Sequence, residues 1–289
     1  MEFLQPATWP EALALKAGHP DALPIAGGTD VMVEINFDRA RPAFIIDLTK
    51  IAALEEWGMD GDRLRIGAGV TYTRIIEELG DRLPGLAMAS RTVGSPQIRN
   101  RGTVGGNLGS ASPAGDAHPP LLASGALVEL ASLSGTRRLP VHEFYIGPKR
   151  NAMRGDELIA AVLVEPAKGP QQFSKVGTRN AMVIAVCSFA IALDAQRRRI
   201  GTGIGSAAPT PVTAGDAERF IEGVLDEGGS WERKAEVDAA AMARFGELVA
   251  AAARPIDDVR GTADYRKHAL AVLARRSFAW AWDEYRRSA

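Results

Sequence analysis

The sequence predicts an α+β protein in which a mixed α/β region is followed by a C-terminal region of antiparallel strands and helices. Three observations support this fold class. Short apolar runs separated by glycine fill residues 1–164, a Pro- and Gly-containing breaker segment follows at 165–170, and helical spacing of apolar residues dominates beyond Pro211. With 46% hydrophobic and 24% charged residues, the 289-residue chain also has the composition of an ordinary globular protein.

The N-terminal region alternates between strand and helix patterns. Apolar runs predict strands at residues 23–26, 44–48, 64–67 and 126–130. Apolar residues at helical spacing predict helices at 10–17 and 71–79. We expect a first domain of residues 1–170, made of two α/β subdomains at about 1–55 and 56–170.

The second domain is expected to span residues 171–289. Its apolar segments 183–193 and 199–205 flank the polar stretch that begins at Asp194, which is typical of an antiparallel hairpin. Helices are predicted at 213–223, 232–253 and 262–286, with Thr213 and Thr262 as N-caps.

Charge and cysteine content exclude several classes of function. Lys and Arg number 34 and Asp and Glu 35, so the formal net charge of −1 gives no global field for nucleic acid or an anionic membrane. The single cysteine, Cys187, lies in an apolar run and is interpreted as a buried thiol; it cannot supply the four ligands of an iron–sulfur cluster. The four histidines lack metal-ligand spacing, so no metal site is expected.

No signal peptide or membrane-spanning segment is apparent, and we expect a cytoplasmic location without membrane insertion.

Two glycine clusters are the strongest functional signals. The first, Ala26-Gly27-Gly28-Thr29-Asp30, follows a predicted strand. Adjacent glycines permit positive φ and leave backbone N–H groups accessible, which is the arrangement of an anion-binding nest. A simple tight turn explains this cluster equally well.

The second cluster runs from Gly102 to Asp116 and is predicted to be a 15-residue loop. Almost no bulky apolar side chain lies in it, and long loops of this kind are usually functional or disordered. Its small and polar residues could bind phosphate or ribose, and the following His118 is expected to be a loop residue beside the site. The candidates are Thr103, Gly105, Gly106, Asn107, Ser110 and Asp116.

Neither cluster matches the familiar nucleotide-binding motifs. The sequence contains no P-loop, and Gly201–Gly205 fails the dinucleotide G-x-G-x-x-G spacing, so a strand or bulge is the better interpretation there. Two separate glycine nests can instead hold the two phosphates of one dinucleotide from both sides, which indicates FAD.

The paired AGGTD and TVGGNLGSASPAGD motifs, followed by Phe173-Ser-Lys-Val-Gly-Thr-Arg179, resemble the FAD-binding medium subunit of molybdenum hydroxylases. This family includes xanthine dehydrogenase and aerobic carbon monoxide dehydrogenase. The resemblance covers almost the whole chain and implies a fold in which two nests, one in each α/β subdomain, bind FAD. It also implies that molybdopterin and two 2Fe–2S clusters belong to partner subunits.

The resemblance also assigns roles to individual residues. It places the first cluster around the pyrophosphate and the second opposite it, with Asp116 toward the ribose. Lys175, which the local pattern alone would leave at the surface, is placed close to the isoalloxazine, where a cation would stabilise negative charge on the reduced cofactor. The full set implied is Ile25, Ala26, Gly27, Gly28, Thr29, Asp30, Val31, Ile98, Thr103, Gly105, Gly106, Asn107, Ser110, Asp116, Ile159 and Lys175.

The function implied is electron transfer by an oxidoreductase subunit. The chain would bind FAD noncovalently, take electrons from the small 2Fe–2S subunit of a complex that also contains the large molybdopterin subunit, and pass them to an external acceptor. We expect a dimer of heterotrimers. The alternatives are a stand-alone flavin-dependent oxidoreductase of the same fold and a cofactor-free subunit that only bridges partners.

Overall fold

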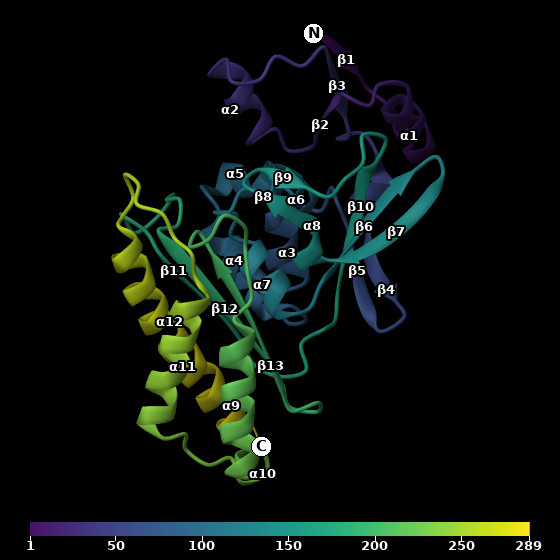
Figure 1. The fold of residues 1–289 in the computed structure, drawn as a ribbon. Coiled ribbons are helices and arrows are strands. Elements are labelled where there is room, and N and C mark those ends of the chain that lie inside the picture. The colour runs from purple at the N-terminus through teal and green to yellow at the C-terminus, as the bar shows by residue number, and fades with distance from the viewer. Residues whose placement is uncertain (289) are drawn as a thin grey trace.

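The computed structural model describes residues 1–288 and begins with a small N-terminal unit, at the top of Figure 1. Its three strands form a parallel sheet in the order β1-β3-β2. Thr8 caps α1 by accepting a hydrogen bond from the Glu11 backbone N–H, and Pro10 occupies the first turn. The elements are β1 (Glu2–Leu4), α1 (Trp9–Gly18), β2 (Leu23–Ile25), α2 (Val31–Asn36) and β3 (Phe44–Asp47).

The middle unit is built on a five-stranded antiparallel sheet in the order β4-β5-β10-β6-β7. Every residue of the central strand β10 is buried. The elements are the 3-10 helix η1 (Ala52–Leu54), β4 (Trp57–Asp60), β5 (Arg63–Gly67), α3 (Tyr72–Glu78), α4 (Pro84–Thr92), α5 (Pro96–Arg101), α6 (Val104–Ser110), α7 (His118–Ala123), β6 (Leu127–Ser132), β7 (Gly135–Pro140), α8 (Val141–Phe144), β8 (Tyr145–Gly147), β9 (Arg150–Asn151) and β10 (Leu158–Val164).

The C-terminal unit, green to yellow in Figure 1, is a three-stranded antiparallel sheet covered by helices. The long helix α12 packs against β11 and β12 and is capped by Thr262, which accepts from the Tyr265 N–H at 3.2 Å. The elements are β11 (Gln171–Val176), β12 (Cys187–Asp194), β13 (Arg199–Gly205), α9 (Gly215–Glu227), α10 (Ser230–Arg233), α11 (Ala239–Ala252) and α12 (Ala263–Arg287).

Helix α7 joins the middle and C-terminal units by packing directly on β13. A Cβ atom at Gly201 would lie 2.0 Å from the Ala123 carbonyl oxygen, and one at Gly203 would lie 2.0 Å from that of Pro119. Any larger residue would therefore force the helix off the strand. The glycine run is a strand, as expected, and its glycines serve this close approach rather than a nucleotide.

Most predicted elements are present, with differences in the helices. The hairpin is confirmed as β12 and β13, and Cys187 is buried. The helix expected at 232–253 is confirmed only over α11, because Lys234 has a positive φ and ends α10 before α11 begins. Thr213 caps nothing, since α9 starts at Gly215 without a side-chain cap.

The prediction of a loop from Gly102 to Asp116 is wrong in its first half, which forms helix α6. Thr103 caps the helix, and Ala111, with a φ of 44°, ends it in the left-handed region. The apolar pair Val104 and Leu108, four residues apart, is fully buried.

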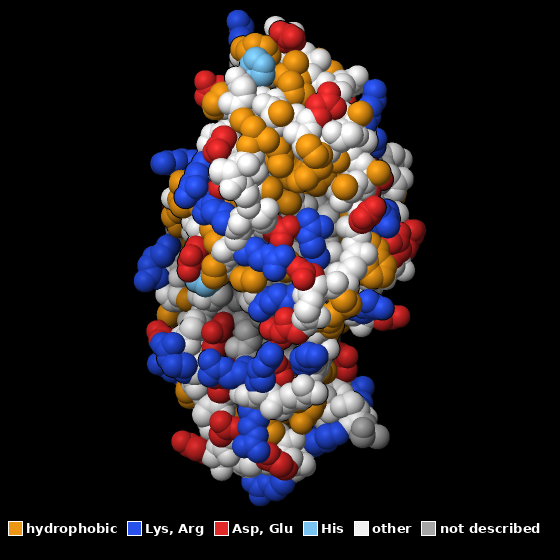
Figure 2. All heavy atoms as spheres, turned by 90° about the vertical axis from the view of Figure 1, so that its right-hand side faces the viewer, with side chains coloured by type: hydrophobic (Ala, Val, Ile, Leu, Met, Phe, Trp, Pro, Cys, Tyr) orange, Lys and Arg blue, Asp and Glu red, His pale blue; other side chains and the backbone are white. Residues whose placement is uncertain are grey.

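Surface charges are mixed in sign. On the face shown in Figure 2, hydrophobic side chains gather in the upper part, and Lys, Arg, Asp and Glu are interspersed below. This distribution agrees with the formal net charge of −1 and gives no single-sign surface on this face. Within residues 1–288, no helix combines the length and apolar character needed to cross a membrane.

Candidate functional site

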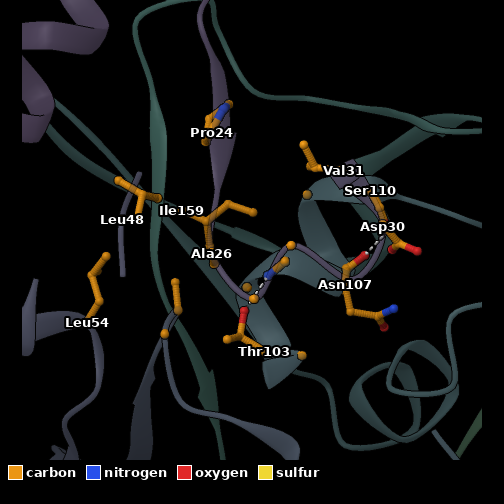
Figure 3. Close-up of a pocket in the computed structure, with 18 of the residues that line it drawn as sticks. Pro24, Ala26, Asp30, Val31, Leu48, Leu54, Thr103, Asn107, Ser110 and Ile159 are labelled. Carbon is orange, nitrogen blue, oxygen red and sulfur yellow. Dashed lines mark hydrogen bonds between the residues drawn. The ribbon is translucent and has the colours of Figure 1, made fainter. Parts of the chain in front are cut away.

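A cavity of about 580 Å³ lies between the N-terminal and middle units. This volume is in the range of about 300–1,000 Å³ that is typical of small-molecule and cofactor sites. Its lining includes Ala26 and Asp30 of the first glycine cluster and Thr103, Asn107 and Ser110 of the α6 region, all labelled in Figure 3. The cavity is therefore formed by the two sequence clusters facing each other.

The first wall is the turn between β2 and α2. Gly28 has a φ of +75°, which L side chains rarely adopt. A Cβ atom at Gly27 would lie 1.8 Å from the carbonyl oxygen of Arg101, so the turn packs directly on the end of α5. The backbone N–H groups of Gly27, Gly28 and Thr29 have no hydrogen-bond partner among the described residues. They are available to an anionic ligand, as a nest requires.

The second wall is the first turn of α6, and its backbone donors are already used. The N–H of Val104 donates to Val70, that of Gly105 to Ala68, and that of Gly106 to the Thr103 hydroxyl at 2.9 Å. This wall can therefore meet a ligand with side chains rather than with free backbone N–H groups. The sequence predicts two glycine nests. In the structure, the free backbone N–H donors lie in the first of them.

Glycine at position 105 allows α6 to lie against the chain at Ala68. A Cβ atom there would come within 2.5 Å of the Ala68 side chain and 2.6 Å of its carbonyl oxygen. Both glycines line the cavity, but a Cβ at Gly106 would meet only the Thr103 hydroxyl, at 3.1 Å. A side chain at position 105 would therefore disrupt the packing of α6, whereas one at position 106 would not contact the neighbouring chain.

Apolar side chains form a further part of the cavity surface. Ile159 of β10 is buried, and Ile98 of α5 is partly exposed. Leu48 and Leu54, which the sequence did not single out, join them (Figure 3). Leu48 is the last residue of a predicted strand, and Leu54 lies next to the expected subdomain boundary.

A polar end of the cavity was also missed. It is lined by Lys16, Asp21, Arg154 and Glu157. Lys16 donates to the carbonyl oxygens of Pro20 and Ala22 at 2.7 and 2.8 Å, and burial lowers the pKa of Lys16. The sequence pattern of α1 does not distinguish this buried lysine from an exposed one.

Thirteen of the sixteen predicted site residues line the cavity, and three do not. Those that do are Ala26, Gly27, Gly28, Thr29, Asp30, Val31, Ile98, Thr103, Gly105, Gly106, Asn107, Ser110 and Ile159. Ile25, Asp116 and Lys175 lie outside this lining.

Asp116 and Lys175 form a buried ion pair. Their side chains are 9% and 8% exposed, and Lys175 Nζ donates to Asp116 Oδ2 at 2.6 Å and to the Thr92 carbonyl at 3.0 Å. Burial raises the pKa of Asp116, and the nearby Lys175 ammonium and the Thr92 hydroxyl oppose that rise. The surface position that the local pattern gave Lys175 is therefore wrong.

His118 is fully buried at the start of α7 rather than in a loop beside the site. Its Nδ1 lies 2.7 Å from the Tyr145 hydroxyl. Burial lowers the pKa of His118 to about 3, so the imidazole is neutral at physiological pH.

Residues 1–166 match the family model described as the FAD binding domain in molybdopterin dehydrogenase, and residues 172–281 match the CO dehydrogenase flavoprotein C-terminal domain. The chain belongs to this family of FAD-binding subunits. It is an oxidoreductase component of the molybdenum hydroxylase family and carries an FAD-binding domain.

Individual relatives support this family membership. The chain is 29% identical over 280 residues to the xanthine dehydrogenase FAD-binding subunit of Escherichia coli O157:H7, covering 93% of this chain and 92% of that one. It is 36% identical over 201 residues to the nicotinate dehydrogenase FAD-subunit of Eubacterium barkeri, covering 66% and 68%. A solved structure of reconstituted CO dehydrogenase from Oligotropha carboxidovorans superposes with a TM-score of 0.88 and 27% identity over 98% of both chains.

The residues of this FAD-binding subunit fit the cofactor. The free N–H groups at Gly27 to Thr29 suit a pyrophosphate. The apolar surface at Ile98 and Ile159 suits flat rings. Among residues 1–288, no group of three or more His, Cys, Asp and Glu side chains is arranged to hold a metal ion.

Proposed function

We propose that the chain is the electron-transfer subunit of a heteromeric molybdenum hydroxylase. It takes electrons from the 2Fe–2S clusters of a small partner subunit and passes them to an external acceptor. The observation that carries this proposal is the cavity between two glycine-rich walls, one of which presents unpaired backbone N–H groups. When bound there, FAD supplies the redox centre.

The cavity residues hold the cofactor noncovalently in this proposal. The N–H groups of Gly27, Gly28 and Thr29 bind the pyrophosphate, and Thr103, Asn107 and Ser110 contribute polar side chains from the other wall. Ile98 and Ile159 contact the rings. The remaining proposed cofactor contacts are Ala26, Asp30, Val31, Gly105 and Gly106 at the cavity, with Ile25 behind the first turn.

Asp116 and Lys175 act in this proposal through their ion pair. Lys175 remains our candidate for adjusting the redox properties of the cofactor, because a buried cation changes the energy of negative charge developing nearby. Asp116 fixes the lysine ammonium and partly offsets its charge.

The proposed domain division follows the sheets. The parallel sheet and the five-stranded sheet belong to residues 1–170, with the subdomains meeting near residue 55, and the sheet of β11 to β13 belongs to residues 171–289. The gap between the two family matches, at residues 167–171, supports this division.

The proposed partners are a small 2Fe–2S subunit and a large molybdopterin subunit, assembled as a dimer of heterotrimers in the cytoplasm. Names among the relatives support a multisubunit complex, such as the medium chain of carbon monoxide dehydrogenase from Afipia carboxidovorans, 28% identical over 284 residues. Neither nucleic acid nor a membrane is a partner in this proposal.

The full chain and its Gly106→Val variant test the cofactor assignment. We expect one FAD per wild-type chain, released into the supernatant by acid precipitation, because the attachment is noncovalent. The Gly106→Val variant should fold yet purify without FAD, since its side chain enters the cavity.

Gly223→Val is the matched control, because Gly223 also lies in a helix, α9, and a Cβ there would meet nothing within 4 Å. It should retain full FAD content. Flavin absorbance per chain and circular dichroism measure both outcomes, and full FAD occupancy in Gly106→Val would show that the cofactor lies elsewhere.

A further inference from the structure

Two buried polar atoms without partners lie behind the α6 wall. One is Nε2 of His118 and the other is Oδ1 of Asn107, and neither has a hydrogen-bond partner among the described residues. Buried polar groups are normally satisfied, because leaving one unpaired costs roughly 1–3 kcal/mol. This pair of unpaired atoms therefore calls for a physical explanation.

The two atoms face the same point, beside Gly115. A Cβ atom at Gly115 would lie 2.3 Å from His118 Nε2 and 2.8 Å from Asn107 Oδ1. Glycine at this position is what allows the imidazole and the amide to approach each other. Asn107 is the link to the site, because it also lines the cavity.

The surroundings of His118 favour the tautomer with its single proton on Nε2. The Tyr145 hydroxyl, 2.7 Å from Nδ1, can donate to an unprotonated ring nitrogen. Asn107 Oδ1 lies on the Nε2 side of the ring, beside Gly115. The Ser112 carbonyl accepts from the Gly115 N–H at 3.0 Å, whereas Asn107 Oδ1 has no donor among the described residues.

We propose that His118 is a positioning residue for the cofactor site, whose Nε2–H donates to Asn107 Oδ1 when the cofactor is bound and thereby directs the amide NH2 of Asn107 into the cavity. Tyr145 fixes the tautomer from the other side of the ring. The NH2 group then donates to an acceptor oxygen of the ligand. This inference rests on the proposed function, in which that ligand is FAD.

The orientation of Asn107 matters because the two ends of its amide have opposite hydrogen-bonding character. With Oδ1 held by His118, the cavity receives a donor, which suits phosphate and hydroxyl oxygens. With the amide reversed, it would receive an acceptor that repels a phosphate. A neutral histidine buried beyond the reach of solvent maintains one orientation across the physiological pH range.

Nitrogen-15 NMR of the full chain with labelled histidine tests the tautomer directly. The His118 signals are assigned by their loss in His118→Gln, since only four histidines are present. We expect the neutral Nε2–H tautomer at pH 7, and a shift toward the other tautomer in Tyr145→Phe. A neutral Nδ1–H tautomer in the wild-type chain would overturn the proposal, whatever the chain binds.

A double-mutant cycle on FAD affinity tests whether His118 acts through Asn107. Asn107→Ala should weaken binding by about 10- to 100-fold, which corresponds to one lost hydrogen bond to a charged group, and His118→Leu should weaken it about tenfold. In the Asn107→Ala background, His118→Leu should have no further effect, because the residue that it orients is gone. His118→Gln, which keeps a side-chain N–H, should recover part of the loss.

The outcomes separate the two proposals. Thermal unfolding of the cofactor-free variants measures folding, and exposed His142→Gln serves as the histidine control that leaves affinity unchanged. If the two substitutions weaken FAD binding independently, so that their fold-changes multiply in the double variant, the positioning role is overturned. The proposal that the chain binds FAD would still stand. A wild-type chain that binds no FAD would overturn the proposed function itself, and with it the assignment of the Asn107 donor to a cofactor.

Discussion

Lys175 and Asp116 are charged residues whose side chains are buried against each other. Their carboxylate–ammonium contact of 2.6 Å lies in the interior, where removing one partner leaves an uncompensated charge. In the sequence, the two residues are 59 positions apart, and no local pattern connects them. The pair connects the segment after α6 to strand β11 and so joins the middle unit to the C-terminal unit.

Lys175→Met should destabilise the chain by about 3 kcal/mol at pH 7, in the range found when one partner of a buried pair is removed. Burial already raises the pKa of Asp116, and losing the ammonium raises it further. A carboxyl whose folded-state pKa exceeds its unfolded value binds more protons when folded. The loss of unfolding free energy in Lys175→Met should therefore be small near pH 4 and grow as the pH rises toward 7.

Urea unfolding of wild type and Lys175→Met between pH 4 and 7 measures this dependence. Adding Asp116→Asn to the variant removes the buried charge and should restore part of the stability at pH 7. A loss that is the same at every pH would contradict the ion-pair explanation.

At the scale of an element, α6 shows a helix that tertiary contacts impose on a sequence of low helix propensity. Three of its seven residues are glycines, each of which costs about 1 kcal/mol relative to alanine. Two fully buried apolar side chains, the Thr103 cap and the contact of Gly105 with Ala68 offset that cost. The helix then supplies one wall of the cavity.

Thr103→Ala should destabilise the chain by about 1 kcal/mol, because the Gly106 N–H loses its acceptor. FAD affinity should fall as well, since Thr103 and the first turn of α6 line the cavity. The matched control is Thr262→Ala, which removes the cap of α12 and should cost a similar amount without changing FAD affinity.

Chemical denaturation and flavin fluorescence titration of both cap variants compare the two effects. Thr103→Ser, which keeps the hydroxyl, should remain close to wild type in both measurements. Equal FAD affinity in Thr103→Ala and Thr262→Ala would show that the α6 wall does not contact the cofactor.

At the scale of the whole molecule, the cavity exists because the N-terminal and middle units meet. The Gly27 turn contacts the end of α5, and the cavity has lining residues from both units. The described residues provide neither a metal cluster nor the four cysteines of an iron–sulfur cluster.

The isolated chain loaded with FAD should be reduced by dithionite and then reduce an acceptor dye. A purine, an aldehyde or an N-heterocycle should leave it oxidised, because hydroxylating such carbons requires the molybdenum centre of another subunit. Stopped-flow absorbance of the flavin measures both reactions. Direct reduction by an organic substrate would favour a stand-alone flavin-dependent oxidoreductase instead.

Elements with strong periodic patterns could be predicted from the sequence. The strand expected at 64–67 lies within β5, and the helix expected at 262–286 is α12, because burying one face of an element requires apolar residues at regular spacing along the chain. Helices α4 to α7 were not predicted from the sequence. They are short and rich in glycine or proline, so contacts from distant segments stabilise them rather than their own composition.

The sequence by itself determined the α+β class, the two glycine clusters and the family that they indicate, since each depends on which residues are neighbours along the chain. Only the tertiary structure decided which cluster keeps free backbone donors, that Lys175 is buried against Asp116, and that His118 lies behind Asn107. These features depend on hydrogen-bond partners and burial contributed by residues far apart in the sequence, which local patterns do not encode.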